Sequence, residues 1–100
     1  MQALSLLRIQ ARANRLANLR LHQAMAPLSP AELHAPRVGF FPSLLATLNH
    51  ILAVDLYYIA VLHAEPGARD LWMAFVPPET LPALAERQRV SDERLIDWLE

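Results

Sequence analysis

The fold of this chain is decided by residues 40–62, FFPSLLATLNHILAVDLYYIAVL, the longest apolar stretch in the sequence. Apolar residues recur in it at three- and four-residue spacings, and the run is far too long for a strand. A second apolar stripe lies beside the first, so we expect little of this helix to contact water. The first stripe holds Phe41, Leu44, Leu48, Ile51, Ile59 and Leu62, and the second holds Phe40, Val54, Tyr57, Tyr58 and Val61. The pattern predicts the inner helix of an all-α bundle.

Two polar side chains, Thr47 and His50, share the second stripe of this helix. The pattern therefore carries a histidine into the predicted interior. A lone histidine on an apolar face is more often a hydrogen-bonded core residue than a metal ligand. Asp55 follows five residues later, about 140° around the helix from His50. We therefore expect Asp55 to form an ion pair with an arginine rather than to support His50.

Further helices are predicted on both sides of this stretch. The first covers residues 2–26, and the last covers residues 79–99, with Leu81, Leu84, Gln88, Ser91, Leu95 and Trp98 on one side. Ser29, Pro30 and Glu32 form a start signal for a single helical turn between the first two helices.

Residues 68–76 connect the second and last helices and are too apolar for a flexible linker. We predict that this segment crosses over the bundle and packs Leu71, Trp72 and Phe75 against one of its ends. A crossover of this length permits the two helices that it joins to run parallel.

Asn14 and Asn18 lie one turn apart on an inner stripe of the first helix. Asparagine is a poor interior helix former, so the pair needs a structural reason. Two interpretations stay open: amides hydrogen-bonded to a neighbouring helix or backbone, or amides that line a polar pocket. If the first two long helices are antiparallel neighbours, both amides flank His50 within about one helical turn, roughly 6 Å of axial offset.

Two motifs carry a family resemblance. Residues 41–55 read Phe-x-Ser-x-x-x-Thr-Leu-Asn-His-x-x-x-x-Asp, and residues 14–18 read NRLAN. Both are similar to signatures of the DinB (damage-inducible) family of bacterial four-helix-bundle proteins, in which an aromatic residue usually stands at the position of Leu16. The resemblance implies an up-down-down-up four-helix bundle. Residues 1–100 would supply its first three helices as a single domain that lacks the expected fourth helix.

The resemblance also implies a metal site. In the family, a His-x-x-x-His pair on the fourth helix joins the histidine that matches His50, and here Asn14, Asn18 and Thr47 would border the pocket. A zinc or nickel ion in such a site needs three protein ligands and an open position. None of the four histidines lies three or four residues from another, so the chain has no helical ligand pair. We therefore expect the site to be incomplete or unoccupied within one copy.

Composition excludes several functional classes. The net charge of −1 gives no basic surface for nucleic acid, and 54% hydrophobic residues exclude a disordered chain. The absence of cysteine excludes a thiolate ligand or nucleophile.

His50 and Asp55 interrupt the best candidate for a membrane span, so we expect no membrane contact. The first 31 residues contain four arginines and no acid, a composition that is also typical of a targeting helix. Because the motif with Asn14 and Asn18 lies inside this segment, we prefer a helix of the domain. We therefore expect a cytoplasmic protein.

Two functional hypotheses follow. The resemblance implies a divalent-metal-dependent enzyme, of the thiol S-transferase or hydrolase-like kind, that uses a low-molecular-weight thiol or another small molecule; its catalytic residues are unknown. The alternative is a non-catalytic helical interaction module. Because the predicted apolar faces are wide and leave an open groove where a fourth helix is expected, the interaction module should form a homodimer or associate with the missing segment.

Overall fold

The computed structural model describes residues 2–39 and 41–100, and within them the secondary structure is entirely helical. The long helices are α1 (Gln2–Met25), α3 (Leu44–Leu62) and α5 (Leu81–Leu99). Two short helices, α2 (Pro30–His34) and α4 (Ala68–Met73), lie in the connections. The predicted all-α class is confirmed, and each predicted helix is present.

Local side-chain hydrogen bonds fix where the helices start. Ser29 caps α2 in a capping box with Glu32, as predicted. The helix α3 begins at Leu44, later than the predicted start at residues 40–41, because the Ser43 hydroxyl accepts a hydrogen bond from Ala46 N at 3.0 Å. Thr80 caps α5 in the same way, so that helix begins two residues later than predicted. The predicted stripe position at residue 40 lies outside the described residues.

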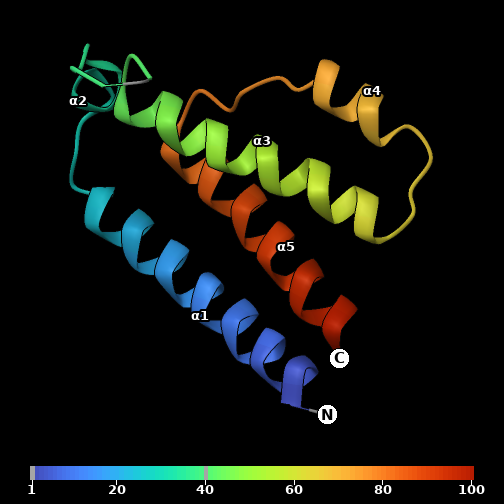
Figure 1. Cartoon of the computed structure of the whole chain (residues 1–100). Coiled ribbons are helices and arrows are strands. Elements are labelled where there is room, and N and C mark those ends of the chain that lie inside the picture. The colour runs from blue at the N-terminus through green and yellow to red at the C-terminus, as the bar shows by residue number, and fades with distance from the viewer. Residues whose placement is uncertain (1, 40) are drawn as a thin grey trace.

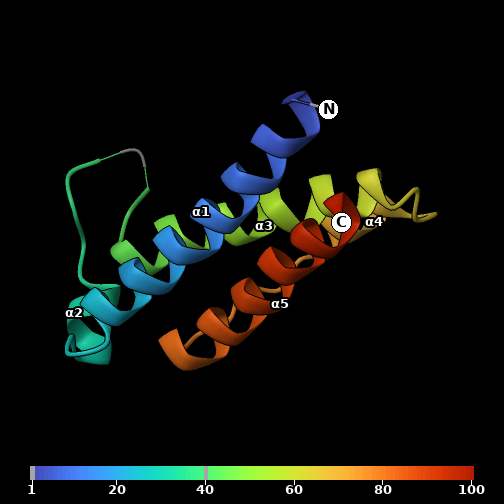
Figure 2. The ribbon, with the colours of Figure 1, turned by 90° about the horizontal axis from the view of Figure 1, so that it is seen from below.

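The helix α5 lies between the other two long helices (Figure 1). Seen from below, α1 and α5 form an antiparallel pair with the two chain termini at the same end (Figure 2). The helix α3 packs against α5 and runs in the same direction (Figure 1). The expectation that α1 and α3 are direct neighbours is wrong, because α5 buries residues toward both of them and so separates them.

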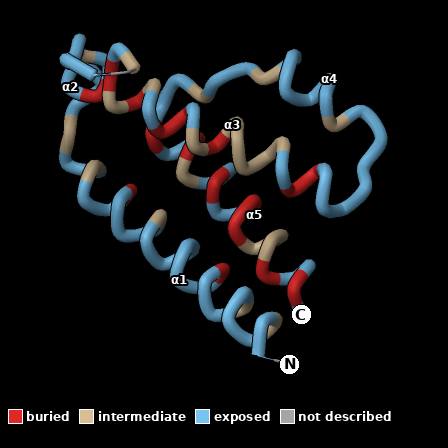
Figure 3. Tube along the Cα trace, viewed as in Figure 1, coloured by how far each residue is buried: buried red, intermediate tan, exposed pale blue. Residues whose placement is uncertain are grey.

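The apolar core is divided into two clusters along α5 (Figure 3). One cluster joins α3 to the first turns of α5, and the other joins the start of α1 to the last turns of α5. Between them, α5 buries the polar residues Gln88, Ser91 and Asp92. The first cluster holds Leu33, Leu45, Leu48, Leu52, Leu81 and Leu84, and the second holds Ala11, Ile96 and Leu99. The core therefore contains a polar layer at mid-height.

The helix α3 is less enclosed than its sequence predicts. Tyr58 is 61% exposed and Val61 is 48% exposed, because α5 covers one side of α3 and α4 only part of another. The helix α3 is long and apolar enough to cross a membrane, with a mean hydropathy of 1.6. By length and hydropathy, therefore, His50 and Asp55 do not interrupt a membrane span as expected. The core helix of a soluble protein passes the same test.

The connection between α3 and α5 contains a helix that the sequence did not predict. The helix α4 lies along the second half of α3 (Figure 1), where Trp72 meets Tyr57 edge to face at 5.9 Å. No residue of α4 is buried, and Leu71 and Trp72 remain well exposed. Of the three residues predicted to pack on an end of the bundle, Phe75 contacts the core. The crossover thus covers the side of α3 rather than an end.

Candidate functional site

The polar layer is a network of five side chains from all three long helices: Asn14, Asn18, Asp55, Gln88 and Asp92. Its centre is the Asp92 carboxylate, which is only 2% exposed. Asn18 Nδ2 donates to Asp92 at 3.0 and 3.2 Å, and Asn14 Nδ2 donates at 3.2 Å. Gln88 Nε2 donates to it at 3.0 Å. Neutral amide donors therefore solvate a carboxylate that is almost fully removed from water.

Gln88 links this centre to α3. The same Nε2 group also donates to Asp55 Oδ2 at 2.8 Å, so one buried amide bridges two carboxylates. Burial raises the pKa of Asp55; the hydrogen bond from Gln88 opposes that rise, and the charge of Asp92 adds to it. The predicted ion pair between Asp55 and an arginine is wrong, since none of the ion pairs among residues 2–39 and 41–100 includes Asp55. Gln88 occupies the place expected for an arginine.

Both interpretations describe part of the structure, because Asn14 and Asn18 donate to Asp92 and Asn18 also lines a cavity between α1 and α5. The two side chains are amides hydrogen-bonded to a neighbouring helix, although Asn14 is exposed and Asn18 is only partly buried. They do not flank His50, because their partner is on α5 and α1 does not pack against α3.

Sequence reasoning missed Asp92, the residue on which the network depends. Its signal was available: Asp92 follows Gln88 by one helical turn and therefore lies beside it on the inner side of α5. Two polar residues at that spacing on an apolar side predict a shared buried partner.

His50 lies on the surface of α3, so the expectation that it enters the interior is wrong. Its ring packs on the ring of Phe41, with centroids 4.5 Å apart and an angle of 31° between the planes. No hydrogen bond or ion pair engages its ring nitrogens within the described part of the chain. The predicted pocket residue Thr47 is also exposed, and its hydroxyl donates to Ser43 O at 3.1 Å, a bond internal to the helix. The His50 imidazole is therefore accessible but not enclosed.

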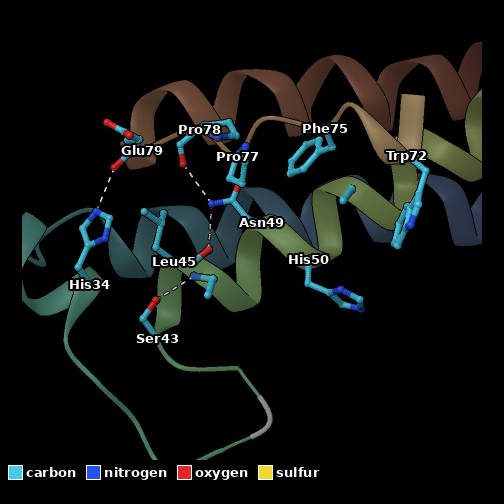
Figure 4. A pocket seen from close by; sticks show the side chains of 12 residues that line it. His34, Ser43, Leu45, Asn49, His50, Trp72, Phe75, Pro77, Pro78 and Glu79 are labelled. Carbon is cyan, nitrogen blue, oxygen red and sulfur yellow. Dashed lines mark hydrogen bonds between the residues drawn. The ribbon is translucent and has the colours of Figure 1, made fainter. Parts of the chain in front are cut away.

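A shallow cavity of about 420 Å³ lies beside His50, between α3 and the segment that leads into α5 (Figure 4). Asn49, the residue before His50, closes one wall by donating to Leu45 O at 3.2 Å and to Pro78 O at 3.1 Å. In Figure 4 the His50 ring extends away from these bonds. Since both neighbours of the Asn49 amide nitrogen are carbonyl oxygens, Asn49 fastens the crossover to α3 rather than serving a ligand.

The other histidines do not join His50. His34 Nε2 bonds Glu79 O at 3.2 Å, and His63 Nδ1 bonds Ile59 O at 2.9 Å. His22 is buried against α5. Within the ranges 2–39 and 41–100, no three His, Cys, Asp or Glu side chains are grouped as metal ligands. The side chains that the structure describes do not by themselves form a site for a divalent metal ion.

A match to a known protein family covers almost the whole chain. No curated protein and no solved structure gives a significant match. The sequence profile of the DinB family matches residues 5–100, which includes all five helices apart from the first residues of α1. Both motifs, around Asn14 and around His50, lie inside the matched range. The chain therefore belongs to the DinB family.

Proposed function

We propose that this chain contributes His50 as one ligand to a metal-dependent enzyme of the thiol S-transferase or hydrolase-like kind. The remaining ligands come from a second copy of the chain. The expected ion is zinc or nickel, which when bound makes a water or an external thiol more nucleophilic. A low-molecular-weight thiol is the expected small-molecule partner, and the cytoplasm is the expected compartment.

The accessibility of His50 supports this proposal. His22 is buried, whereas His34 and His63 each commit a ring nitrogen to a backbone carbonyl. The His50 ring is exposed and oriented by Phe41, and neither nitrogen is engaged within the described residues. A histidine that binds a metal ion together with ligands from another molecule must be accessible and held in a fixed orientation. One chain supplies one such ligand, so the site is complete only with ligands from outside that chain.

The metal content of the purified protein tests the proposal. We would load the protein with zinc or nickel, remove free ion, and measure bound metal by elemental mass spectrometry coupled to size exclusion and light scattering. The expected result is metal that co-elutes with a dimer and is lost in His50→Ala. His34→Ala is the matched control, because it removes an exposed imidazole whose Nε2 is already bound to Glu79 O. Metal at background in the wild type, or equal loss in both variants, contradicts the proposal.

A second candidate is a non-catalytic interaction module that dimerises. Leu6, Leu7 and Ile9 near the start of α1 are each at least half exposed, and Tyr58 and Val61 expose further apolar surface on α3. Exposed apolar side chains on two helices favour a partner that covers them. In the same experiment, a dimer that contains no metal supports this candidate, and a monomer with no metal contradicts both.

A further inference from the structure

A larger cavity, of about 880 Å³, lies between α1 and α5 and shares no residue with the cavity beside His50. We call it the α1/α5 cavity. Apolar and polar side chains both line it: Asn18, His22 and Asp92 reach its inner end, and Gln23, Glu86 and Glu93 line it elsewhere, with both glutamates paired to Arg89. The apolar wall residues are Leu16, Leu19, Ala26, Pro82 and Ala85. An apolar cleft with a few polar groups at defined positions is the usual form of a small-molecule site.

His22 is a buried polar group of this cavity that lacks a protein partner within the described residues. It is 9% exposed, yet within the described part of the chain its ring forms no hydrogen bond or ion pair. Its nitrogens are not sealed from the cavity, unlike the buried, unpaired Asn49 Oδ1 and Ser91 Oγ. Burial lowers the pKa of His22, and the charge of Asp92 opposes that shift. A neutral imidazole offers one donor and one acceptor, and neither has a protein partner within the described residues, so both are available to a ligand in the cavity.

Arg15 is the cationic group at the mouth that has no partner. Arg12 pairs with Glu100, and Arg89 pairs with Glu86 and Glu93. Arg15 is exposed, and residues 2–39 and 41–100 provide it with no ion pair or hydrogen bond. It precedes His22 by seven positions on the same side of α1, so about 10 Å of helix axis separates their Cα atoms. A free guanidinium and a free imidazole therefore mark the two ends of an apolar cleft.

We propose that the α1/α5 cavity binds an apolar monocarboxylate that carries a hydroxyl or carbonyl group at its far end. The carboxylate pairs with the Arg15 guanidinium, the apolar body lies against Leu19 and Ala85, and the far polar group hydrogen-bonds His22. The orientation follows from charge, since Asp92 near His22 repels a carboxylate from the inner end. Asp92 itself is occupied by amide donors and does not bind a cation.

The proposal is tested with ω-hydroxyoctanoate, octanoate and octanol, measured by isothermal titration calorimetry and by amide chemical shifts in NMR. We expect saturable binding of ω-hydroxyoctanoate, with shifts grouped over residues 15–26 and 82–93. Arg15→Gln should weaken binding of both acids about tenfold, the usual scale of one lost charged contact, and leave octanol unchanged. Arg20→Gln is the matched control, because Arg20 is another exposed arginine of α1 that does not line the cavity.

Two further variants keep the test decisive. His22→Phe should reduce the affinity for ω-hydroxyoctanoate to that for octanoate, and circular dichroism checks that it folds. Ala85→Phe should weaken binding of all three compounds by narrowing the cavity where their apolar body lies, without removing a polar group.

Three results overturn the proposal. The first is the absence of saturable binding, and the second is equal effects of Arg15→Gln and Arg20→Gln. The third is a dimer that Ala85→Phe disrupts and that excludes the acids, because a second copy of the chain would then occupy the cleft.

Discussion

At the scale of single residues, Asp92 determines how the interior of this protein is held together. Its carboxylate is 2% exposed and accepts hydrogen bonds from Asn14, Asn18 and Gln88. Asp92→Ala removes the acceptor that Asn14, Asn18 and Gln88 share; the partly buried Asn18 then loses its partner, and Gln88 keeps only its bond to Asp55. We expect a loss of about 2–4 kcal/mol in the free energy of unfolding, measured by urea denaturation.

Ser91→Ala is the matched control for this prediction. Ser91 is as buried as its neighbour, at 1% exposed, but its hydroxyl has no partner within the described residues. Removing it relieves an unpaired polar group, so stability should stay constant or rise by up to about 1 kcal/mol. A similar loss in both variants would mean that the volume at these positions matters and the hydrogen bonds do not.

Asp55 makes a second prediction at this scale, about pH. Its pKa is raised in the folded chain, mainly by burial, so unfolding releases a proton at pH values between its unfolded and folded pKa. The contribution of Asp55 to stability is therefore present at lower pH and lost as the pH rises through the folded pKa. Asp55→Asn should be at least as stable as the wild type at neutral pH and should lack this decline. Urea denaturation at several pH values from the ordinary carboxyl range to neutrality measures both slopes, and identical slopes would count against the assignment.

At the scale of elements, the start of α3 depends on one side chain. The Ser43 hydroxyl is mostly buried and accepts the backbone N–H of Ala46 at 3.0 Å, so water does not easily replace it. Ser43→Ala should cost about 1 kcal/mol in thermal or urea unfolding. Ser43→Asp should restore most of that loss, because aspartate is an equally good cap and its charge is favourable at a helix N-terminus. If both variants lose the same stability, the contact that matters is packing against the Ser43 side chain.

Specific contacts also connect the elements at their ends. Arg8 Nε donates to Leu99 O at 2.6 Å, and Arg12 pairs with Glu100, so the start of α1 is fastened to the end of α5. These arginines neutralise the carbonyl end of α5, where positive charge is favourable. The α1–α5 pair therefore has contacts at its end and at the polar layer, which together fix the α1/α5 cavity between them.

At the scale of the whole molecule, the position of α5 explains why the surface is so apolar. Because α5 lies between α1 and α3, each of those helices buries one side and leaves others open. The exposed apolar residues on α1 and α3 follow from that arrangement. The combined metal and light-scattering experiment above measures whether a second copy covers them.

The sequence by itself determined the three long helices, the start signal at Ser29, the family, and the absence of a histidine pair at helical spacing. These properties depend on periodicity, capping residues and motifs, which are local and so are visible in the chain. The tertiary structure alone decided which helices are neighbours. The packing of α5 against both other long helices brought Asn14 and Asn18 to Asp92 and left His50 at the surface. An apolar stripe in the sequence shows which side of a helix can be buried, but not which helix covers it. The same packing also created the α1/α5 cavity, because a cleft exists only between two helices whose packing distance and register are already fixed.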